Sequence, residues 1–247
     1  MEANRSMGSV GSKLRHDILS PDAWLEARKE LLVKEKEFTK LRDELSQARR
    51  DLAWEPVKED YVFEGPQGPV KLSDLFEGHS QLIVYHLMYS PDWDAACPSC
   101  SFWADGFDPI IVHLNHRDTS MVAISRAPHP KLEEYEKRMG WSFKWFSSGN
   151  NSFNYDYGVS FPQDDVDRGT CRYNYTVGDC GVTDKEGISV FFKTSDGTMY
   201  HTYSTYERGI DLMNSAYNYL DLTPNGRDED LMSMREWLRR HDEYDKP

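Results

Sequence analysis

The sequence predicts an α/β protein in which a parallel strand–helix–strand unit is followed by an antiparallel hairpin and a final helix. Two apolar runs, residues 82–89 and 118–125, have the length and the side chains of buried strands. Helical patterns follow both runs, from residue 98 to about 116 and over 131–139. A strand, a helix and a second strand in succession indicate parallel pairing through a right-handed crossover.

A long charged helix is predicted before this unit. Residues 1–19 are small, polar and without periodicity, which predicts a flexible leader. Ser20 and Pro21 supply an N-cap and a first-turn proline. The helical pattern then continues to about Leu52, within an amphipathic segment that spans residues 20–55.

An apolar seam runs along this predicted helix. Large apolar side chains recur at every seventh position, at Trp24, Leu31, Phe38, Leu45 and Leu52. The seam could pack on the protein's own domain or partly against a second copy. At ~1.5 Å per residue the helix is about 45 Å long, which exceeds the width of a small domain. A homodimer is therefore the predicted assembly, because symmetric dimers are the commonest oligomers.

The residues after the helix form one predicted domain, 56–222. Residues 61–72 are typical of a hairpin with a Gly/Pro turn. The polar, aromatic stretch 141–186 is predicted to be an insertion that covers the sheet. Residues 188–192 and 198–203 are joined by Asp-Gly, which predicts an antiparallel hairpin.

The C-terminal part of the chain is predicted to be helical. A last helix over about 207–220 completes the domain. A short helix at 228–241 is predicted within a charged tail, 223–247.

Composition narrows the classes of partner. The chain has 42 acidic and 29 basic residues, for a formal net charge of −13. This charge argues against nucleic acid and against an anionic membrane surface as partners. No apolar stretch approaches the ~20 residues that a membrane span needs. The first residues contain no apolar core of a secretory signal, so a cytoplasmic protein is predicted.

The sequence places a pair of cysteines directly after the first apolar strand. Cys97, Pro98, Ser99 and Cys100 form a C-x-x-C turn at the predicted start of a helix. This spacing brings the two sulfurs within reach of a disulfide. The helix start favours the thiolate of Cys97 and lowers its pKa. We therefore predict that Cys97 is the exposed, attacking thiol and that Cys100 is the buried, resolving thiol.

The order of elements, with the dithiol at the first helix of the βαβ unit, is that of the thioredoxin fold. Six segments carry a more specific resemblance: YHLMYSPDW (85–93), CPSCSFWADGF (97–107), SRAP (125–128), MGW (139–141), FNYDYGV (153–159) and YHTYSTY (200–206). They are similar to those of the thioredoxin-like family catalogued as domain of unknown function eight-nine-nine. The resemblance extends from about residue 20 to 222 and implies a thioredoxin-like fold.

The resulting functional prediction is a thiol–disulfide oxidoreductase or a thiol-dependent peroxidase that uses Cys97 and Cys100. Its substrate would be a protein or small-molecule thiol or disulfide, and no cofactor is predicted. One departure from thioredoxins concerns the cis-proline that faces their dithiol. The matching position here is Gly187, which removes the usual backbone clamp for substrate and opens space beside the sulfurs.

Two alternatives remain open on sequence alone. Copper or zinc could bind Cys97, Cys100 and His201, because both metals favour thiolate and imidazole, and the protein would then be a metal-dependent oxidase or a metal carrier. His113 and His116 are excluded as further ligands, since a continuous helix puts His113 roughly 20 Å from Cys100. The other alternative is a non-enzymatic, redox-sensing interaction protein whose long helix binds partners.

Three further residues stand out in the sequence, one histidine and two cysteines. His86 alternates with apolar residues on its strand, which predicts a core histidine with its hydrogen bonds satisfied. Cys171 and Cys180 flank a short loop in the insertion. They could pair with each other, act as a secondary exchange pair, or be two inert thiols.

Overall fold

The computed structural model describes residues 16–229 and 237–244. The chain divides into two compact units, one up to Leu52 and one from Ala53 onward. Most of the predicted leader 1–19 and half of the predicted tail helix 228–241 lie outside the described residues. Within 16–229 and 237–244, no helix is both long and apolar enough to cross a membrane.

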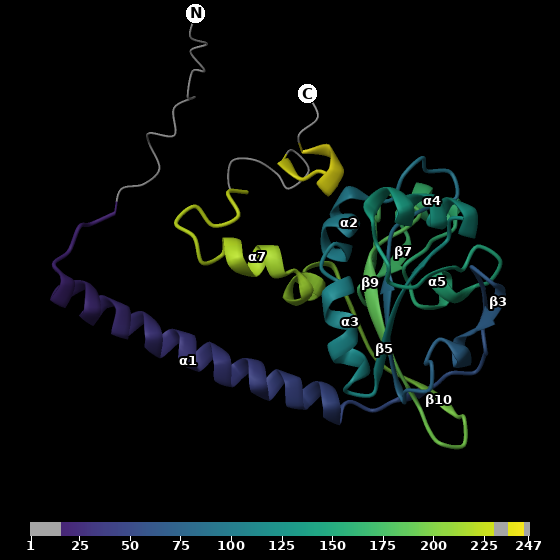
Figure 1. The fold of residues 1–247 in the computed structure, drawn as a ribbon, viewed down its shortest axis with the longest axis horizontal. Coiled ribbons are helices and arrows are strands. Elements are labelled where there is room, and N and C mark those ends of the chain that lie inside the picture. The colour runs from purple at the N-terminus through teal and green to yellow at the C-terminus, as the bar shows by residue number, and fades with distance from the viewer. Residues whose placement is uncertain (1–15, 230–236, 245–247) are drawn as a thin grey trace, which may run out of the picture. The chain divides into compact units, whose positions relative to one another are not determined.

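The first unit contains the predicted long helix, α1 (Pro21–Asp51) (Figure 1). Ser20 caps it by accepting a hydrogen bond on Oγ from the Ala23 N–H at 3.3 Å. No residue of α1 is buried. The apolar seam is accordingly exposed, with Trp24 at 59 % and Phe38 at 66 % of their full accessible area.

The second unit is built on an eight-stranded sheet with the order β1-β10-β9-β4-β5-β6-β2-β3. A separate two-stranded ribbon pairs β7 with β8. The strands are β1 (Glu55–Pro56), β2 (Val62–Gly65), β3 (Gly68–Lys71), β4 (Gln81–His86), β5 (Thr119–Ser125), β6 (Trp145–Ser147), β7 (Cys171–Tyr173), β8 (Thr176–Gly178), β9 (Gly187–Lys193) and β10 (Met199–Tyr206).

The four central strands define the fold. β4 pairs parallel with β5, and β4 and β10 both pair antiparallel with β9. The order β10-β9-β4-β5, with the C-x-x-C helix directly after β4, is the thioredoxin arrangement. The predicted α/β, thioredoxin-like fold is therefore confirmed, together with the parallel unit and both hairpins.

The helices differ from the prediction at two places. The continuous helix expected over 98–116 is wrong, because the chain forms α2 (Pro98–Ala104) and then α3 (Asp108–Asn115). Pro109 lies in the first turn of α3, where its missing N–H costs nothing, whereas inside a continuous helix its ring would clash with the Asp105 carbonyl. The stretch 207–220 is likewise divided at Asn214.

Asn214 separates a 3₁₀ helix from a short α-helix and caps the latter with its side chain, which accepts from the Tyr217 N–H at 3.0 Å. Side-chain capping of this kind favours a new helix start over continuation. The remaining helices are α4 (His129–Met139), α5 (Phe153–Asp156), α6 (Gln163–Arg168), α7 (Ser215–Leu220) and the 3₁₀ helices η1 (Leu72–Asp74), η2 (Glu207–Met213) and η3 (His241–Glu243).

One part of the aromatic insertion 141–186 adds a strand to the sheet, and another part covers a face of the sheet. The sequence missed β6, a three-residue strand that pairs parallel with β5 and antiparallel with β2. Phe153 and Tyr157 do cover the sheet, as predicted, and their rings pack on Phe191 of β9. The insertion therefore both extends the sheet and closes one of its faces.

The side chains of β4 alternate between two cores, one on each face of the sheet. Tyr85 belongs to the core that contains Cys100 and Trp103 of α2. Val84 belongs to the other core, together with Phe191. Burying each such side chain contributes about 1.5–3 kcal/mol, so the two cores fix the sheet between its layers.

His86 is a core histidine, as predicted, but its hydrogen bonds are only partly satisfied, because its Nδ1 has no partner in the described part of the chain. Its other ring nitrogen takes part in a chain of buried hydrogen bonds across three strands. Its Nε2 lies 2.8 Å from Ser189 Oγ, which lies 2.9 Å from Ser204 Oγ. Ser204 Oγ in turn lies 2.7 Å from His201 Nε2. Burial, together with the nearby His201, lowers the pKa of His86 to about 3.

The buried His86 predicts acid destabilisation. In the unfolded chain this histidine protonates near its ordinary pKa of 6.5, whereas in the folded protein it stays neutral. Below pH 6.5 the unfolded chain therefore binds more protons at this residue than the folded protein does. The free energy of unfolding consequently falls as the pH decreases from 6.5 toward 3. We expect a loss of about 2 kcal/mol between pH 7.5 and pH 5 in denaturant titrations.

His86→Gln should flatten this pH dependence, because glutamine keeps a polar group toward Ser189 and does not titrate. His113→Gln, at an exposed position of α3, is the matched control and should retain the wild-type slope. Equal slopes for His86→Gln and the wild type would show that His86 does not carry the effect.

Candidate active site

The structure places the C-x-x-C turn at the start of α2, where the sequence predicts it. After β4 the chain loops back so that the Cys97 N–H donates to the Met88 carbonyl at 3.0 Å. Cys97 is the N-cap of α2, and Pro98 occupies its first turn. Arg240, from the C-terminal segment, donates to the Ala96 carbonyl at 2.6 Å. The turn is therefore fixed by one hydrogen bond to the segment that follows β4 and by another from the C-terminal segment.

The two thiols differ in exposure and in acidity. Cys97 is partly exposed, whereas Cys100 is buried, with 2 % of its area accessible. Neither cysteine forms a disulfide. The pKa of Cys97 is lowered to about 6, chiefly by a hydrogen bond from the Cys100 thiol and also by the backbone N–H groups of Cys100 and Ser99, against the opposing effect of burial. Burial raises the pKa of Cys100 well above its usual range. At neutral pH the charge therefore lies on Cys97 and the proton on Cys100.

Tyr85 lies behind the dithiol on β4. Its side chain is fully buried, and its hydroxyl makes no well-formed hydrogen bond to any residue in the described part of the chain. Burial raises the pKa of this phenol, and the neighbouring Cys100 raises it further. The resolving thiol thus faces an uncharged phenol in an apolar layer.

A cavity of about 670 Å³ opens beside the two sulfurs. Its inner wall is apolar and aromatic, and its rim is charged. The inner wall consists of Tyr85, Met88, Cys97, Cys100, Trp103, Ile210 and Tyr217. The charged residues are Lys185, Glu186, Glu207, Arg208, Asp211, Arg227, Asp228 and Glu229.

Gly187 occupies the position that the sequence matches to the thioredoxin cis-proline. It begins β9 and pairs with His86 and with Tyr206. A Cβ added here would lie 2.6 Å from the Tyr206 ring and 3.1 Å from Val159. No peptide bond within the described residues is cis. Glycine is therefore required because aromatic packing takes the space of a side chain.

An ion pair that the sequence did not reveal holds the segment before Gly187. Arg126, at the end of β5, donates from Nε and Nη2 to both oxygens of Asp184 at 2.7 and 2.6 Å. Asp184 is 3 % exposed and also accepts from Ser160 Oγ at 2.8 Å. The carboxylate raises the pKa of Arg126, so the guanidinium keeps its charge. Arg126 belongs to the SRAP motif, but nothing in the sequence marked Asp184 as its partner.

His201 does not join the dithiol. Its ring packs against Phe191 and Tyr157, in the core on the opposite face of the sheet from Cys100. Within 16–229 and 237–244, no three His, Cys, Asp or Glu side chains form a group that could hold a metal ion. The geometry therefore does not assemble the predicted copper or zinc ligand set of Cys97, Cys100 and His201.

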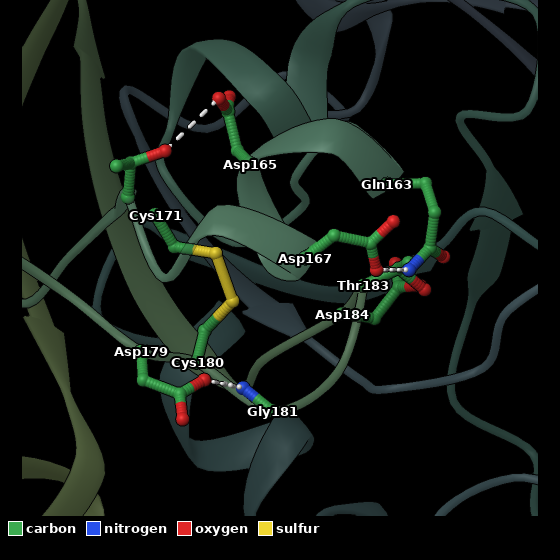
Figure 2. Close-up of a disulfide and its surroundings, with 10 residues drawn as sticks. Gln163, Asp165, Asp167, Cys171, Asp179, Cys180, Gly181, Thr183 and Asp184 are labelled. Atoms are coloured by element: carbon green, nitrogen blue, oxygen red, sulfur yellow. Dashed lines mark hydrogen bonds between the residues drawn. A yellow bond between two sulfur atoms is a disulfide. The ribbon is translucent and has the colours of Figure 1, made fainter.

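Cys171 and Cys180 form a disulfide, which realises one of the three possibilities left open by the sequence (Figure 2). Both cysteines are buried, in a small core with Phe161 and Tyr206. The disulfide closes the β7–β8 ribbon. Tyr173 of this ribbon donates from its hydroxyl to the Glu186 carbonyl at 2.8 Å, so the ribbon is fastened to the rim of the cavity.

Comparison with known families identifies the chain. The profile of the family described as "Bacterial protein of unknown function (DUF899)" matches residues 13–244. The chain belongs to this family. The resemblance inferred from the sequence segments is thus confirmed, and no curated protein matches the chain.

Several solved structures are similar to this DUF899 protein at low identity. A peroxidoxin, BcpB of Mycobacterium tuberculosis, is 15 % identical with a TM-score of 0.45, over 66 % of this chain and 94 % of its own. The bacterioferritin comigratory protein of Xanthomonas campestris is 10 % identical with a TM-score of 0.46, over 67 % and 94 %. PrxQ of Xylella fastidiosa is 10 % identical with a TM-score of 0.43, over 67 % and 95 %. The thioredoxin-like assignment rests on the strand order itself.

The acidity of Cys97 is directly measurable in this DUF899 protein. We expect the rate of Cys97 alkylation by iodoacetamide to rise with pH through a midpoint near 6, because the thiolate is the reactive form. Cys100 should remain unmodified over the same range. Peptide mapping by mass spectrometry separates the two sites.

Cys100→Ala is the informative partner variant, since it removes the thiol that donates to Cys97. The alkylation midpoint of Cys97 should then move up toward its ordinary value of 9.0. A wild-type midpoint already near 9.0 would show that the turn does not activate Cys97.

Proposed function

We propose that this protein is a thiol–disulfide oxidoreductase that acts through Cys97 and Cys100. The observation that carries the proposal is the arrangement of the two sulfurs: Cys97 is a partly exposed helix N-cap that opens onto a cavity, and the buried Cys100 donates a hydrogen bond to it. This is the geometry of an attacking thiolate with its resolving thiol one helical turn away.

The reaction proceeds in two exchange steps. The Cys97 thiolate attacks one sulfur of a substrate disulfide, forms a mixed disulfide and releases the first substrate half as a thiolate. Cys100 then loses its proton, which is taken up by the departing thiolate, and attacks the Cys97 sulfur. The second substrate half leaves, and a Cys97–Cys100 disulfide remains. The substrate is reduced by two electrons and the dithiol is oxidised by two.

The surroundings of Cys100 suit this second step. Because burial and the Cys97 charge both raise the pKa of Cys100, its thiol stays protonated until Cys97 has reacted. Formation of the mixed disulfide removes the negative charge from Cys97. Cys100 can then ionise more easily and resolve the intermediate. A peroxide is the other oxidant that the same thiolate can attack, and Cys100 would then resolve a sulfenic acid.

Single substitutions at the two thiols separate their roles. After addition of an excess of a small disulfide, Cys97→Ser should form neither a mixed disulfide nor a Cys97–Cys100 bridge. Cys100→Ser should instead accumulate the mixed disulfide on Cys97, because no resolving thiol follows. Intact-mass spectrometry with peptide mapping reads both outcomes. If Cys97→Ser reacts at the wild-type rate, the proposal fails.

We also propose that α1 mediates a homodimer. Four large apolar residues of α1, and Leu52 directly after it, repeat at seven-residue spacing, and α1 has no buried residue in the described structure. Full burial of each would contribute about 1.5–3 kcal/mol, which favours association through the seam. Two copies of α1 packed along these residues would form a short coiled coil, for which this spacing is suited.

Light scattering tests this assembly. The intact protein should have about twice its chain mass of 28.7 kDa, and Phe38→Asp should lower the mass toward one chain because it puts a charge into the seam. Lys36→Asp, on the opposite side of α1, introduces the same residue outside the seam and should leave the mass unchanged. A wild-type monomer at tens of micromolar would contradict the proposal.

A further inference from the structure

Residues 225–229 form one wall of the cavity beside the dithiol, in contact with Tyr217. Arg227 fastens this wall, donating to Asp221 at 2.9 Å and to Asp211 at 3.0 Å. Its guanidinium also lies 3.9 Å from the centre of the Tyr217 ring. The wall is therefore part of the folded domain.

Glu229 supplies a second attachment. Its carboxylate accepts hydrogen bonds from the Tyr217 hydroxyl at 2.8 Å and from the indole N–H of Trp237 at 3.0 Å. Residues 227–229 therefore line the cavity and are attached to the domain at Arg227 and at Glu229. A wall on this side of Cys97 leaves less room for a folded protein than for a small molecule, which favours a substrate that fits inside the cavity.

The size of the cavity agrees with this restriction. Pockets for small ligands typically measure roughly 300–1,000 Å³ and combine apolar walls with a few polar groups. At about 670 Å³, with Cys97 and Cys100 in its wall, the cavity has room for a small disulfide. Residue 187 is a glycine, so no proline clamp is present at this position. The substrate must therefore be positioned by the cavity walls.

The charge of the cavity beside the sulfurs is negative. Five acidic and three basic residues line it, a formal excess of two negative charges, and Arg227 pairs with Asp211 of this set and with Asp221 outside it. Among the described residues, no ion pair involves the Glu186 carboxylate. The Glu186 carboxylate acts on both sulfurs of the dithiol, since it raises the pKa of Cys97 and of Cys100.

We propose that this cavity selects small disulfides that carry positive charge, such as the disulfides of aminothiols, and that Glu186 is the specificity-determining residue. The inference rests on the proposed oxidoreductase function and names its substrate class. An ammonium group of the substrate pairs with Glu186 while the adjacent S–S bond lies at Cys97. One such disulfide and the dithiol give two aminothiols and the Cys97–Cys100 disulfide, so that atoms and electrons balance.

Three disulfides of similar length and different charge test the selectivity. Cystamine carries two positive charges, bis(2-hydroxyethyl) disulfide none, and 3,3′-dithiodipropionate two negative charges. The rate of Cys97 oxidation is measured with each at pH 8, by acid quench and mass spectrometry. Each rate is divided by the rate of 2-mercaptoethanol with the same disulfide, which removes differences in intrinsic reactivity. We expect cystamine to exceed dithiodipropionate by at least tenfold.

Glu186→Gln should reduce this ratio severalfold, because it removes the charge and keeps the shape of the side chain. Glu134→Gln, an exposed position on α4, is the matched control and should keep the wild-type ratio. Insulin serves as the protein disulfide and should be reduced far more slowly than cystamine.

The outcomes distinguish the two proposals. If Cys97 reacts with none of the three disulfides, the oxidoreductase function is overturned. If it reacts with all three at equal normalised rates, or prefers dithiodipropionate, the charge selectivity is overturned while the function stands. A wild-type preference that Glu186→Gln leaves intact overturns the role of Glu186. Rapid reduction of insulin overturns the restriction to small substrates.

Discussion

The buried ion pair between Arg126 and Asp184 is the interaction on which the geometry of the site depends. It joins the end of β5 to the segment that enters β9, and Asp184 is only 3 % exposed. Glu186 and Gly187 follow directly, so the pair sets where the rim of the cavity and the start of β9 lie relative to the dithiol. Removing one partner of such a buried pair typically costs about 3–5 kcal/mol, because the other charge is left without compensation.

Aromatic packing then takes over a role that a proline has in thioredoxins. The Tyr206 ring fills the space above Gly187, and the Tyr173 hydroxyl holds the Glu186 carbonyl. Tyr173 lies on the ribbon that the Cys171–Cys180 disulfide closes, so the second cysteine pair supports the rim of the cavity (Figure 2). The backbone at Gly187 is thus fixed by the Tyr206 ring and by the hydrogen bond from the Tyr173 hydroxyl. The side chains that line the cavity must therefore recognise the substrate.

The sequence predicted the elements whose signal is local. The apolar run of β4, the helix start at Cys97 and the Asp-Gly hairpin each depend on neighbouring residues, and each is present. The Arg126–Asp184 pair joins residues 58 positions apart and has no local signal. His201 shows a subtler limit: a register irregularity in β10 between His201 and Tyr203 puts His201 on the same face as Ser204, away from the dithiol. Strand periodicity alone cannot locate such a bulge.

Glu186 links the acidity of Cys97 to the charge of what occupies the cavity. When the cavity is empty, this carboxylate opposes ionisation of Cys97, while the Cys100 thiol and the helix N–H groups favour it. A cation beside Glu186 would cancel the opposing charge and leave the favourable contributions in place. Binding of a positively charged disulfide and formation of the Cys97 thiolate would then strengthen each other. Below the Cys97 pKa of about 6, the fraction of Cys97 present as thiolate would therefore be larger with such a substrate in position than with the cavity empty.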